Sequence, residues 1–395
     1  MAARHIVILV ENLPVPFDRR PWQIAHTLVA AGHRVSVICP AMYEHTARRE
    51  RIDGIDIWRY PSREGATPVG WIREYLNALF WMLLICLRLF FTRGIDVIHA
   101  CNPPDLLFLV AWPFKVFFGT RFLFDHHDLN PEVYLAKFGR RDIVYRALGA
   151  CERLTFGLAD VSLATNESFK RIAVARDGMD PGRIFVVRNA PVRGRLIAGP
   201  ARNELRRGRR HLVAYLGMMN KQDGVDLLLE AARHIIYTLG RGDVGFALIG
   251  DGTELANLKA MAQQSGLADH VRFAGRIGDG RVISDYLNTA DVCVCPDPRN
   301  EMNDHSTMTK VVEYLSVGRP VVAFDLHETL FTAGDTALYA TDNDPRQLAG
   351  LIVRLLDDAP LRHDLGRRGK ERFDAMLSWE RSEESLLAAY AKLGA

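Results

Sequence analysis

Short apolar segments alternate with helical segments along most of this chain, in two runs that meet near residue 200. Such alternation predicts crossover connections, which join parallel strands. We therefore expect an α/β protein with two doubly wound, Rossmann-like domains that face each other across a cleft. The strands expected in the first run are 5–10, 34–39, 55–60, 96–100, 121–124, 160–164 and 184–187. Those expected in the second run are 212–216, 245–249, 270–273, 292–295, 320–324 and 337–339.

The strand pattern lapses over residues 193–210, which contain Gly, Pro and a basic run. This composition is typical of a linker between domains. We expect one domain over 1–195, a second over 205–375, and a C-terminal helix over 376–395. A length of 395 residues with 48% apolar side chains suits two cores of ordinary size.

The charge is unevenly distributed. Residues 1–200 carry a net charge of +7 and residues 201–395 a net charge of −4. A basic first half favours an anionic partner such as a membrane surface or a lipid diphosphate; the alternative is a basic surface that only keeps the protein in solution. Nothing in the pattern indicates nucleic-acid binding.

The six cysteines are scattered without a Cys-x-x-Cys pair, so neither a zinc site nor a disulfide framework is indicated. Reduced thiols and the absence of a signal-peptide pattern at the start predict a cytoplasmic protein. Attachment to the inner face of the plasma membrane is a further expectation.

The segment 71–91 is unusually apolar, and residues 75–87 contain no charge. A spanning helix needs about 20 apolar residues, and Arg73, Glu74 and Arg88 interrupt this one. A buried helix is the first expectation. The alternative is an interfacial helix with Trp71 and Trp81 near lipid headgroups, to which residues 111–118 would add.

Residues 306–324 combine a polar turn, a helix, a glycine turn and an apolar strand. Ser306 and Thr307 are expected to cap the helix. Lys310 lies in its first turn, where free N–H groups favour an anion, and Glu313 shares its face. A cation for phosphate beside a carboxylate for hydroxyls suits a nucleotide-sugar site. The alternative is a solvated Lys–Glu pair.

A second candidate site follows an expected strand in the first run. His126 and His127 lie between two aspartates, the second of which is Asp128, and this arrangement suits acid–base chemistry. The sequence does not separate the two histidines, and a loop that satisfies its own backbone remains an alternative. Asp18 and its two basic neighbours (Arg19 and Arg20) are placed near a phosphate or acceptor, or equally on the surface.

Two interpretations of other motifs, a dinucleotide site and a metal site, are rejected. Gly250-Asp-Gly252 lacks the third glycine of a dinucleotide fingerprint and follows an internal strand. Asp342-Asn-Asp344 has the Asp-x-Asp form that holds a metal in other transferases, but it precedes Pro345 and is better placed as a helix cap. No metal or other cofactor is therefore expected.

The segment from Glu313 to Ala323, EYLSVGRPVVA, resembles the donor-site motif of retaining glycosyltransferases of family 4, which have the GT-B fold. Bacterial enzymes of polysaccharide and exopolysaccharide biosynthesis are of this type. The resemblance covers nearly the whole chain, through Tyr215-Leu-Gly217, Leu248-Ile-Gly250-Asp-Gly252, Arg272-Phe-Ala-Gly275-Arg276-Ile277 and Ala290-Asp-Val-Cys-Val-Cys-Pro296.

The chain departs from that pattern in two places. His305, beside Asp304, stands where the family has the first glutamate of its Glu-x7-Glu pair. Met218-Met219-Asn220 stands where many members carry basic residues for the diphosphate, so Lys221 and Lys310 are the nearest substitutes.

The resemblance implies roles for these residues. Lys310 would stabilise the leaving diphosphate without a metal, Glu313 would bind the ribose hydroxyls, and the backbone of Arg276 and Ile277 would hold the base. His127 would lie by the anomeric carbon, supported by His126 and Asp128. The full donor set is Gly217, Lys221, Gly250, Asp251, Gly252, Arg276, Ile277, Asp304, His305, Ser306, Thr307, Met308, Lys310 and Glu313.

The implied function is retaining transfer of a sugar from a nucleotide-diphosphate donor to a glycan or polyprenyl-diphosphate-linked acceptor. Two rivals share the fold: a GT-B sugar-nucleotide epimerase, and a non-catalytic partner that serves as an assembly surface.

Overall fold

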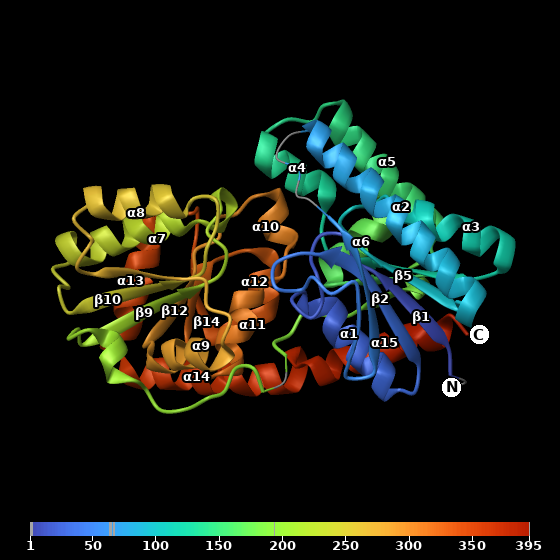
Figure 1. Ribbon diagram of the computed structural model, residues 1–395. Coiled ribbons are helices and arrows are strands. Elements are labelled where there is room, and N and C mark those ends of the chain that lie inside the picture. Colours follow the sequence, from blue (N-terminus) through green and yellow to red (C-terminus); the bar gives the residue numbers. More distant parts are fainter. Residues whose placement is uncertain (1–2, 63–64, 66–67, 193, 395) are drawn as a thin grey trace. The chain divides into compact units, whose positions relative to one another are not determined.

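The computed structural model describes residues 3–62, 65, 68–192 and 194–394, which form two compact units (Figure 1). The first unit is Met1–Arg188 with Ser382–Ala395, and the second is Asn189–Arg381. Both contain a predominantly parallel sheet with helices on its two faces, which is the doubly wound architecture expected from the alternating pattern.

The first unit contains an eight-stranded sheet in the order β3-β4-β2-β1-β5-β6-β7-β8. Only the edge pair β3–β4 is antiparallel. The strands are β1 (His5–Leu9), β2 (Arg34–Ala41), β3 (Arg49–Ile52), β4 (Ile55–Pro61), β5 (Val97–Cys101), β6 (Arg121–His126), β7 (Val161–Ala164) and β8 (Ile184–Val186).

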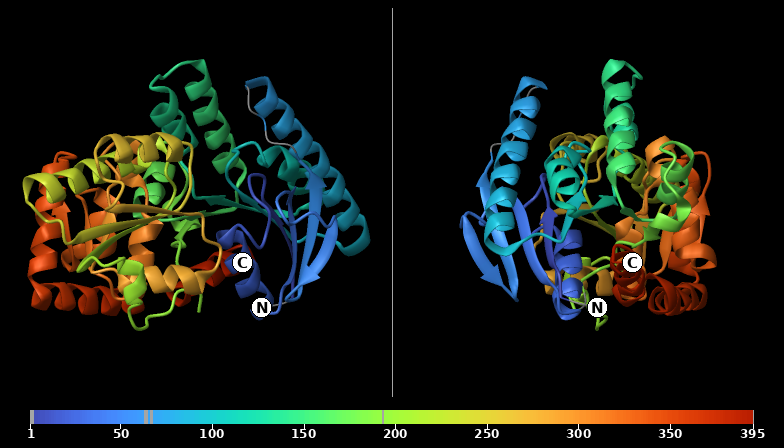
Figure 2. Two further views of the ribbon diagram at one scale, coloured as in Figure 1. Left: turned by 60° about the vertical axis from the view of Figure 1, so that its left-hand side comes forward. Right: turned by 90° about the vertical axis from the view of Figure 1, so that its right-hand side faces the viewer.

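Helices cover both faces of this sheet. The helices α2, α3, α5 and α6 share one hydrophobic core with the strands, and Figure 2 shows α2 (light blue) and α5 (green) on the same side. On the other face, α15 brings Tyr390 to β5, where its hydroxyl contacts His99 Nδ1 at 2.7 Å. The helices are α1 (Arg19–Ala30), α2 (Pro68–Arg93), α3 (Phe108–Phe118), α4 (Asn130–Phe138), α5 (Ile143–Leu158), α6 (Glu167–Ala175) and α15 (Trp379–Lys392).

The second unit contains a parallel six-stranded sheet in the order β11-β10-β9-β12-β13-β14. Figure 1 shows α7 and α8 on one side of this sheet and α9 and α11 on the other. The strands are β9 (His211–Leu216), β10 (Val244–Ile249), β11 (Val271–Gly275), β12 (Val292–Cys295), β13 (Val321–Phe324) and β14 (Ala337–Ala340). The helices are α7 (Val225–Arg233), α8 (Leu255–Gln264), α9 (Gly280–Thr289), α10 (Glu301–His305), α11 (Thr309–Ser316), α12 (His327–Ala333), α13 (Pro345–Asp357) and α14 (Ala359–Arg372).

The strand order reverses direction at one place in each sheet. In the first unit β1 lies between β2 and β5, and in the second unit β9 lies between β10 and β12. The connections leave such neighbouring strands in opposite directions, so a crevice opens at their carboxyl ends, where α/β sheets bind ligands. We therefore expect a ligand site at the carboxyl ends of β1 and β5, and another at those of β9 and β12.

All thirteen expected strands are present, with ends shifted by at most two residues. The sequence analysis missed β3, whose polar sequence RERI has no apolar alternation. A signal for it existed in Asp53-Gly54, which joins β3 to β4 with φ of 49° and 84°. Asp-Gly with positive φ is typical of a tight β-hairpin turn.

The linker prediction for residues 193–210 is wrong in part, because residues 194–210 belong to the second unit and pack along α9; residue 193 lies outside the described residues. The backbone N–H of Ile197 donates to Ser284 Oγ at 3.0 Å, and that of Arg202 donates to Thr289 Oγ1 at 2.8 Å. Side chains of α9 thus satisfy backbone groups that a solvated linker would leave to water.

The apolar segment 71–91 lies in α2, and the first expectation of a buried helix is only half correct. The inner face of α2 is buried against the sheet through Ala78, Met82, Cys86 and Leu89. The outer face is also apolar and is exposed. By length and composition alone, the helix from Gly70 to Arg93 could cross a membrane. Only 22% of its most apolar 18-residue stretch is buried.

The close approach of α7 to the end of β12 yields the first prediction. Gly224 has φ of +64°, and a Cβ there would lie 2.0 Å from the carbonyl oxygen of Pro296. Gly240 has nearly the same φ, +69°, but a Cβ there would have no atom within 4 Å. Gly240→Ala should cost about 1–2 kcal/mol of unfolding free energy from backbone strain alone. Gly224→Ala should cost at least about 1–3 kcal/mol more from overpacking. Urea denaturation measures both, and equal losses would contradict the described packing.

Candidate functional site

A buried ion pair lies at the switch point of the second unit. Lys310 Nζ, on α11, donates to both carboxylate oxygens of Asp297 at 2.7 and 2.6 Å and lies 4.0 Å from Asp223 Oδ1. Asp297 follows β12, and Asp223 ends the turn that leads from β9 to α7. Only 8% of Lys310 and 2% of Asp297 is exposed. Three chain segments therefore meet through these charges.

The electrostatics keep Lys310 charged. Burial by itself lowers the pKa of Lys310, but the Asp297 carboxylate more than compensates and raises it well above its ordinary value. Burial raises the pKa of Asp223, although the Lys310 ammonium opposes that shift. The cluster thus holds one cation, one tightly paired carboxylate, and a second carboxyl group that accepts protons more readily than an ordinary aspartate.

The structure corrects two expectations about this segment. Neither Ser306 nor Thr307 is the N-cap residue of α11: the helix begins at Thr309, its N-cap is Met308, and the Met308 side chain makes no capping hydrogen bond. Ser306 Oγ instead donates to the carbonyl of Met302 at 2.8 Å and completes the end of the short helix α10. Lys310 is buried rather than exposed, because Asp297 draws its ammonium inward toward β12.

Glycines allow the loops after β9 and β10 to approach each other. A Cβ on Gly250 would lie 1.8 Å from the carbonyl oxygen of Gly217, and one on Gly252 would lie 2.4 Å from that of Met219. A Cβ on Gly217 would lie 2.9 Å from Lys310 Cε. Glycine therefore lets the backbones of the two loops pack closely and leaves room beside the Lys310 side chain at Gly217, and close access of backbone to a ligand is a known use of glycine.

Glu313 does not pair with Lys310. Its Oε1 accepts a hydrogen bond from Arg195 NH1 at 2.9 Å, and both side chains are largely buried. The solvated Lys310–Glu313 pair considered as an alternative is therefore excluded. Arg195 comes from the segment interpreted as a linker, which is why the sequence analysis missed it.

The other predicted donor residues lie in the loops around this cluster. Lys221 is exposed at the start of the turn after β9, and Asp251 accepts from Gly252 N at 2.8 Å. Arg276 and Ile277 follow β11. Asp304 accepts from the backbone of His327 at 2.8 Å, which ties α10 to α12. His305 ends α10, one residue before the two polar residues of the turn to α11.

The two histidines of the second candidate site, which lies in the first unit, have different surroundings. His126 ends β6, is fully buried, and its Nε2 contacts Glu152 Oε1 of α5 at 2.8 Å. Arg176 also binds Glu152, at 2.6 Å. His127 follows the strand with its side chain 13% exposed, and its Nδ1 lies 3.6 Å from Asp125 Oδ2. His126 is thus held inside the core, whereas His127 reaches the edge of the sheet.

Asp125, the first of the two aspartates that flank the histidines, organises this edge. Its two oxygens accept from Arg20 Nε at 2.8 Å and Arg20 NH2 at 2.6 Å, and Arg20 NH1 donates to the carbonyl of Val187 at 2.8 Å. Burial would raise the pKa of Asp125, but Arg20 and the two nearby histidines hold it well below its usual value. For His127, burial alone lowers the pKa, and Asp125 reverses this so that the net shift is upward. Arg20 is therefore a buried partner of Asp125, which excludes the surface position considered for it, and its placement near a phosphate or acceptor stays a prediction.

Asp18 and Arg19, which precede Arg20 in the sequence, have different environments. Asp18 is the N-cap of α1 and accepts from the backbone N–H of Arg20 at 3.3 Å, while Arg19 is exposed.

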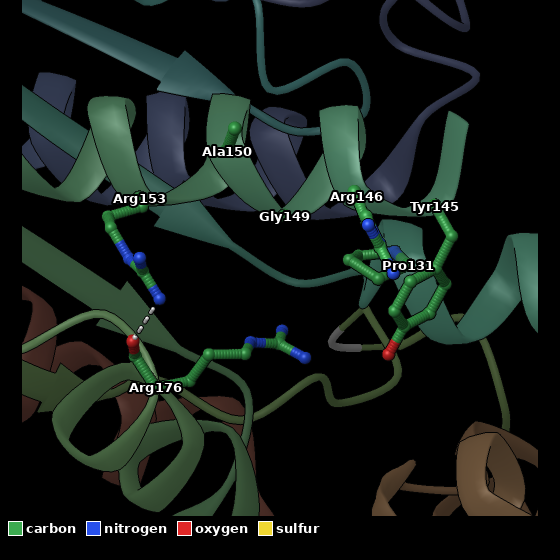
Figure 3. Close-up of a pocket in the computed structure, with 7 residues that line it drawn as sticks. All are labelled: Pro131, Tyr145, Arg146, Gly149, Ala150, Arg153 and Arg176. Atoms are coloured by element: carbon green, nitrogen blue, oxygen red, sulfur yellow. Dashed lines mark hydrogen bonds between the residues drawn. The ribbon is translucent and has the colours of Figure 1, made fainter. Parts of the chain in front are cut away.

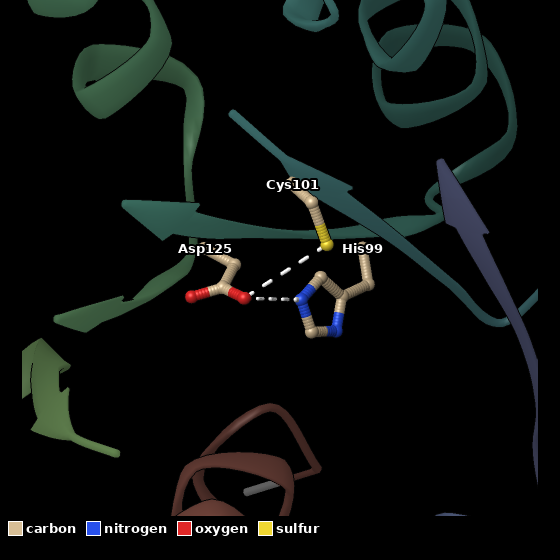
Figure 4. Close-up of side chains that lie close together, drawn as sticks. All are labelled: His99, Cys101 and Asp125. Carbon is tan, nitrogen blue, oxygen red and sulfur yellow. Dashed lines mark hydrogen bonds and ion pairs between the residues drawn. The ribbon is translucent and has the colours of Figure 1, made fainter. Parts of the chain in front are cut away.

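His99, Cys101 and Asp125 lie close together with metal-ligand atom types (Figure 4). The chemistry around them does not suit a cation. The Arg20 guanidinium already occupies Asp125, burial raises the pKa of the Cys101 thiol well above normal, and burial lowers the pKa of His99. A protonated thiol beside a fixed guanidinium is a poor ligand set. We interpret the group as a hydrogen-bonded part of the core.

A shallow hollow lies apart from both strand-end clusters (Figure 3). Three arginines line it, but Arg176 is bound to Glu132 and Glu152, and Arg153 donates to the carbonyl of Arg176 at 3.1 Å. None of the predicted site residues contributes to its lining. The hollow therefore does not define the functional site.

The comparisons with known proteins agree with this arrangement. The family described as "Glycosyl transferase 4-like domain" matches residues 18–190, and the family described as "Glycosyl transferases group 1" matches residues 210–358. Together they cover most of both units. The chain therefore belongs to the family 4 glycosyltransferases, which have the GT-B fold.

Individual relatives are distant. Alpha-D-kanosaminyltransferase of Streptomyces kanamyceticus is 26% identical over 47% of this chain and 46% of its own length, so the chain spans about half of that relative. The 2-deoxystreptamine glucosyltransferase of the same organism is 26% identical over 72% of this chain and 74% of its own length. Among solved structures, sucrose-phosphate synthase from Thermosynechococcus elongatus superposes with a TM-score of 0.78 at 20% identity, over 99% of both chains. A HepE structure from Anabaena in complex with UDP-glucose gives a TM-score of 0.71 at 14% identity, over 98% of this chain and 99% of that chain.

A buried acid at the switch point of the first unit yields the second prediction. Glu11 follows β1 with 5% exposure, and burial, together with Glu74, raises its pKa to about 8. Between pH 4.5 and 8 the unfolded chain ionises this group while the folded protein keeps it protonated, so stability should fall as pH rises through this window. Glu11→Gln should abolish that fall, which amounts to at most about 5 kcal/mol, and should leave stability at pH 4 nearly unchanged. Urea denaturation at a series of pH values measures the free energy of unfolding of both proteins. If it depends on pH in the same way in the wild type and the variant, Glu11 is not neutral in the folded protein.

Proposed function

We propose that this protein is a retaining glycosyltransferase that moves a sugar from a nucleotide-diphosphate donor to a glycan or lipid-linked glycan acceptor. The observation that carries the proposal is the buried Lys310 ammonium at the switch point of β9 and β12, held by Asp297 with Gly217 beside the lysine side chain. Membership of the family and the fold shared with UDP-glucose-binding neighbours support a nucleotide-sugar donor.

Lys310 is assigned to the leaving diphosphate. A positive charge fixed at the start of a helix, in a water-poor site, stabilises charge as the sugar–phosphate bond breaks. Asp297 holds the ammonium in place through two hydrogen bonds. Because a protein cation then takes the task that a metal performs in other transferases, turnover should continue in excess EDTA.

Glu313 and His127 receive the remaining roles. Glu313 is assigned to the ribose hydroxyls, and its partner Arg195 orients the carboxylate. His127 is assigned to the reaction centre in preference to His126, because His126 is fully buried against Glu152.

The compartment is proposed to be the cytoplasm. Five of the six cysteines are buried free thiols, which suits a reducing environment. Assembly of a bacterial polysaccharide is the proposed setting.

A screen of nucleotide sugars by thermal shift, followed by turnover with the best donor, tests the proposal. The expected result is release of nucleoside diphosphate only when acceptor is present, with a product that keeps the donor's anomeric configuration by NMR. Release without acceptor, with an epimerised sugar, would assign the protein to the epimerases. Failure to bind any nucleotide sugar would contradict catalysis altogether.

The Lys310–Asp297 pair yields the third prediction. Lys310→Met alone should cost about 3–5 kcal/mol of stability, because it leaves a buried carboxylate without its partner. The double change Lys310→Met with Asp297→Asn removes both charges and should recover most of that loss. Turnover in the double variant should nevertheless fall by about a hundredfold to a thousandfold, as for loss of a single charge-stabilising donor.

Asp297→Asn alone is the control, since it retains the ammonium and should lose less activity than the double variant. A folded double variant with near-wild-type turnover would refute the role given to Lys310.

A further inference from the structure

The outer face of α2 carries a continuous apolar stripe. Ile72, Leu76, Phe80, Leu84 and Phe91 are between 42% and 75% exposed. The first four are four residues apart in sequence, and the last follows seven residues later, so all five lie along one side of the helix. The opposite side already packs on the sheet, so α2 is apolar on two faces and only one is covered.

The stripe continues onto α3. Leu109, Trp112 and Val116 recur at intervals of three and four, and each is about half exposed. The two helices touch through Phe90 and Phe118, whose ring centres are 4.4 Å apart. The exposed apolar residues of α2 and α3 thus form one surface, which we call the apolar face.

The apolar face also reaches the C-terminal end of α4. Lys137 Nζ lies 5.2 Å from the ring centre of Trp71, at the start of α2, and the ring of Phe138 lies 6.4 Å from that of Trp71. Beyond them Ile143 is 77% exposed at the first position of α5.

The charges around this face have one sign. Among the described residues of α2 to α5 and the α4–α5 loop, every exposed charged side chain is basic: Arg73, Arg88, Lys137, Arg140, Arg141, Arg146 and Arg153. The acidic residues of these elements are buried or half-buried. An apolar stripe with a basic surround complements the headgroups and acyl chains of an anionic lipid surface.

We propose that the apolar face is a membrane-docking surface, on which α2 and α3 lie in the interface of an anionic bilayer. The helix does not span the bilayer in the folded protein, because Ala78, Met82 and Cys86 hold its inner side against the sheet. A second copy of the chain is a poorer occupant, because docking two such faces would bring their basic residues together. The inference concerns binding alone and does not depend on the proposed transfer reaction.

Sedimentation of the full-length protein with vesicles tests the proposal. Vesicles of phosphatidylglycerol mixed with phosphatidylcholine should bind the wild type, and a fraction should remain bound at high salt. Leu76→Ser with Leu84→Ser should weaken binding about tenfold, because these side chains leave water when the face docks. Arg73→Gln with Arg146→Gln should lower binding mainly at low salt, because salt screens the contribution of these charges.

Leu239→Ser with Leu330→Ser is the matched control. These leucines are 43% and 41% exposed, lie in the second unit, and should leave binding unchanged. Circular dichroism checks that all variants are folded. Three results would overturn the proposal: no binding of the wild type, equal binding of the Leu76/Leu84 variant, or a lipid-free dimer that this variant dissociates.

Discussion

The buried ion pair between Lys310 and Asp297 is the interaction on which the architecture of the second unit's site depends. A charge removed from water is costly unless a partner and hydrogen bonds compensate it, and here both carboxylate oxygens bind the ammonium. The pair fixes the start of α11 against the end of β12, while Asp223 brings the turn after β9 to the same place. The connection from β12 to β13, which contains both Asp297 and Lys310, therefore meets the connection from β9 to β10 at one cation.

The first unit contains a similar buried ion pair made of different residues. Asp125, at the end of β6, is held by Arg20 of α1, and the same carboxylate faces His99 and His127. In both units a buried carboxylate at the carboxyl edge of a parallel sheet orients the group beside it: an ammonium in one, an imidazole in the other.

Much of the fold could be predicted from the sequence, because buried parallel strands read as apolar runs and each expected run became a strand. The polar hairpin strand β3 was missed, although its Asp53-Gly54 turn was visible. The site was harder. Gly217, Gly250 and Lys310 could be located from their motifs, but their partners could not.

Asp297 and Arg195 carry no motif, and Asp125, although it flanks the histidine pair, gave no sign of its partner Arg20. Only the tertiary structure brings these residues to their partners. The capping prediction for Ser306 failed for a related reason, because a short helix before it competes for the same hydroxyl. The burial of Lys310 was likewise invisible, since a lysine in a first helical turn is usually solvated.

The central claim is that Lys310 recognises the diphosphate of a nucleotide donor. Calorimetry with nucleoside diphosphate and nucleoside monophosphate, on the wild type and on the folded variant with Lys310→Met and Asp297→Asn, tests it most directly. The wild type should bind the diphosphate more tightly by about tenfold to a hundredfold, as expected for one charge-assisted contact, and the variant should lose most of that preference. An undiminished preference in the variant would contradict the account.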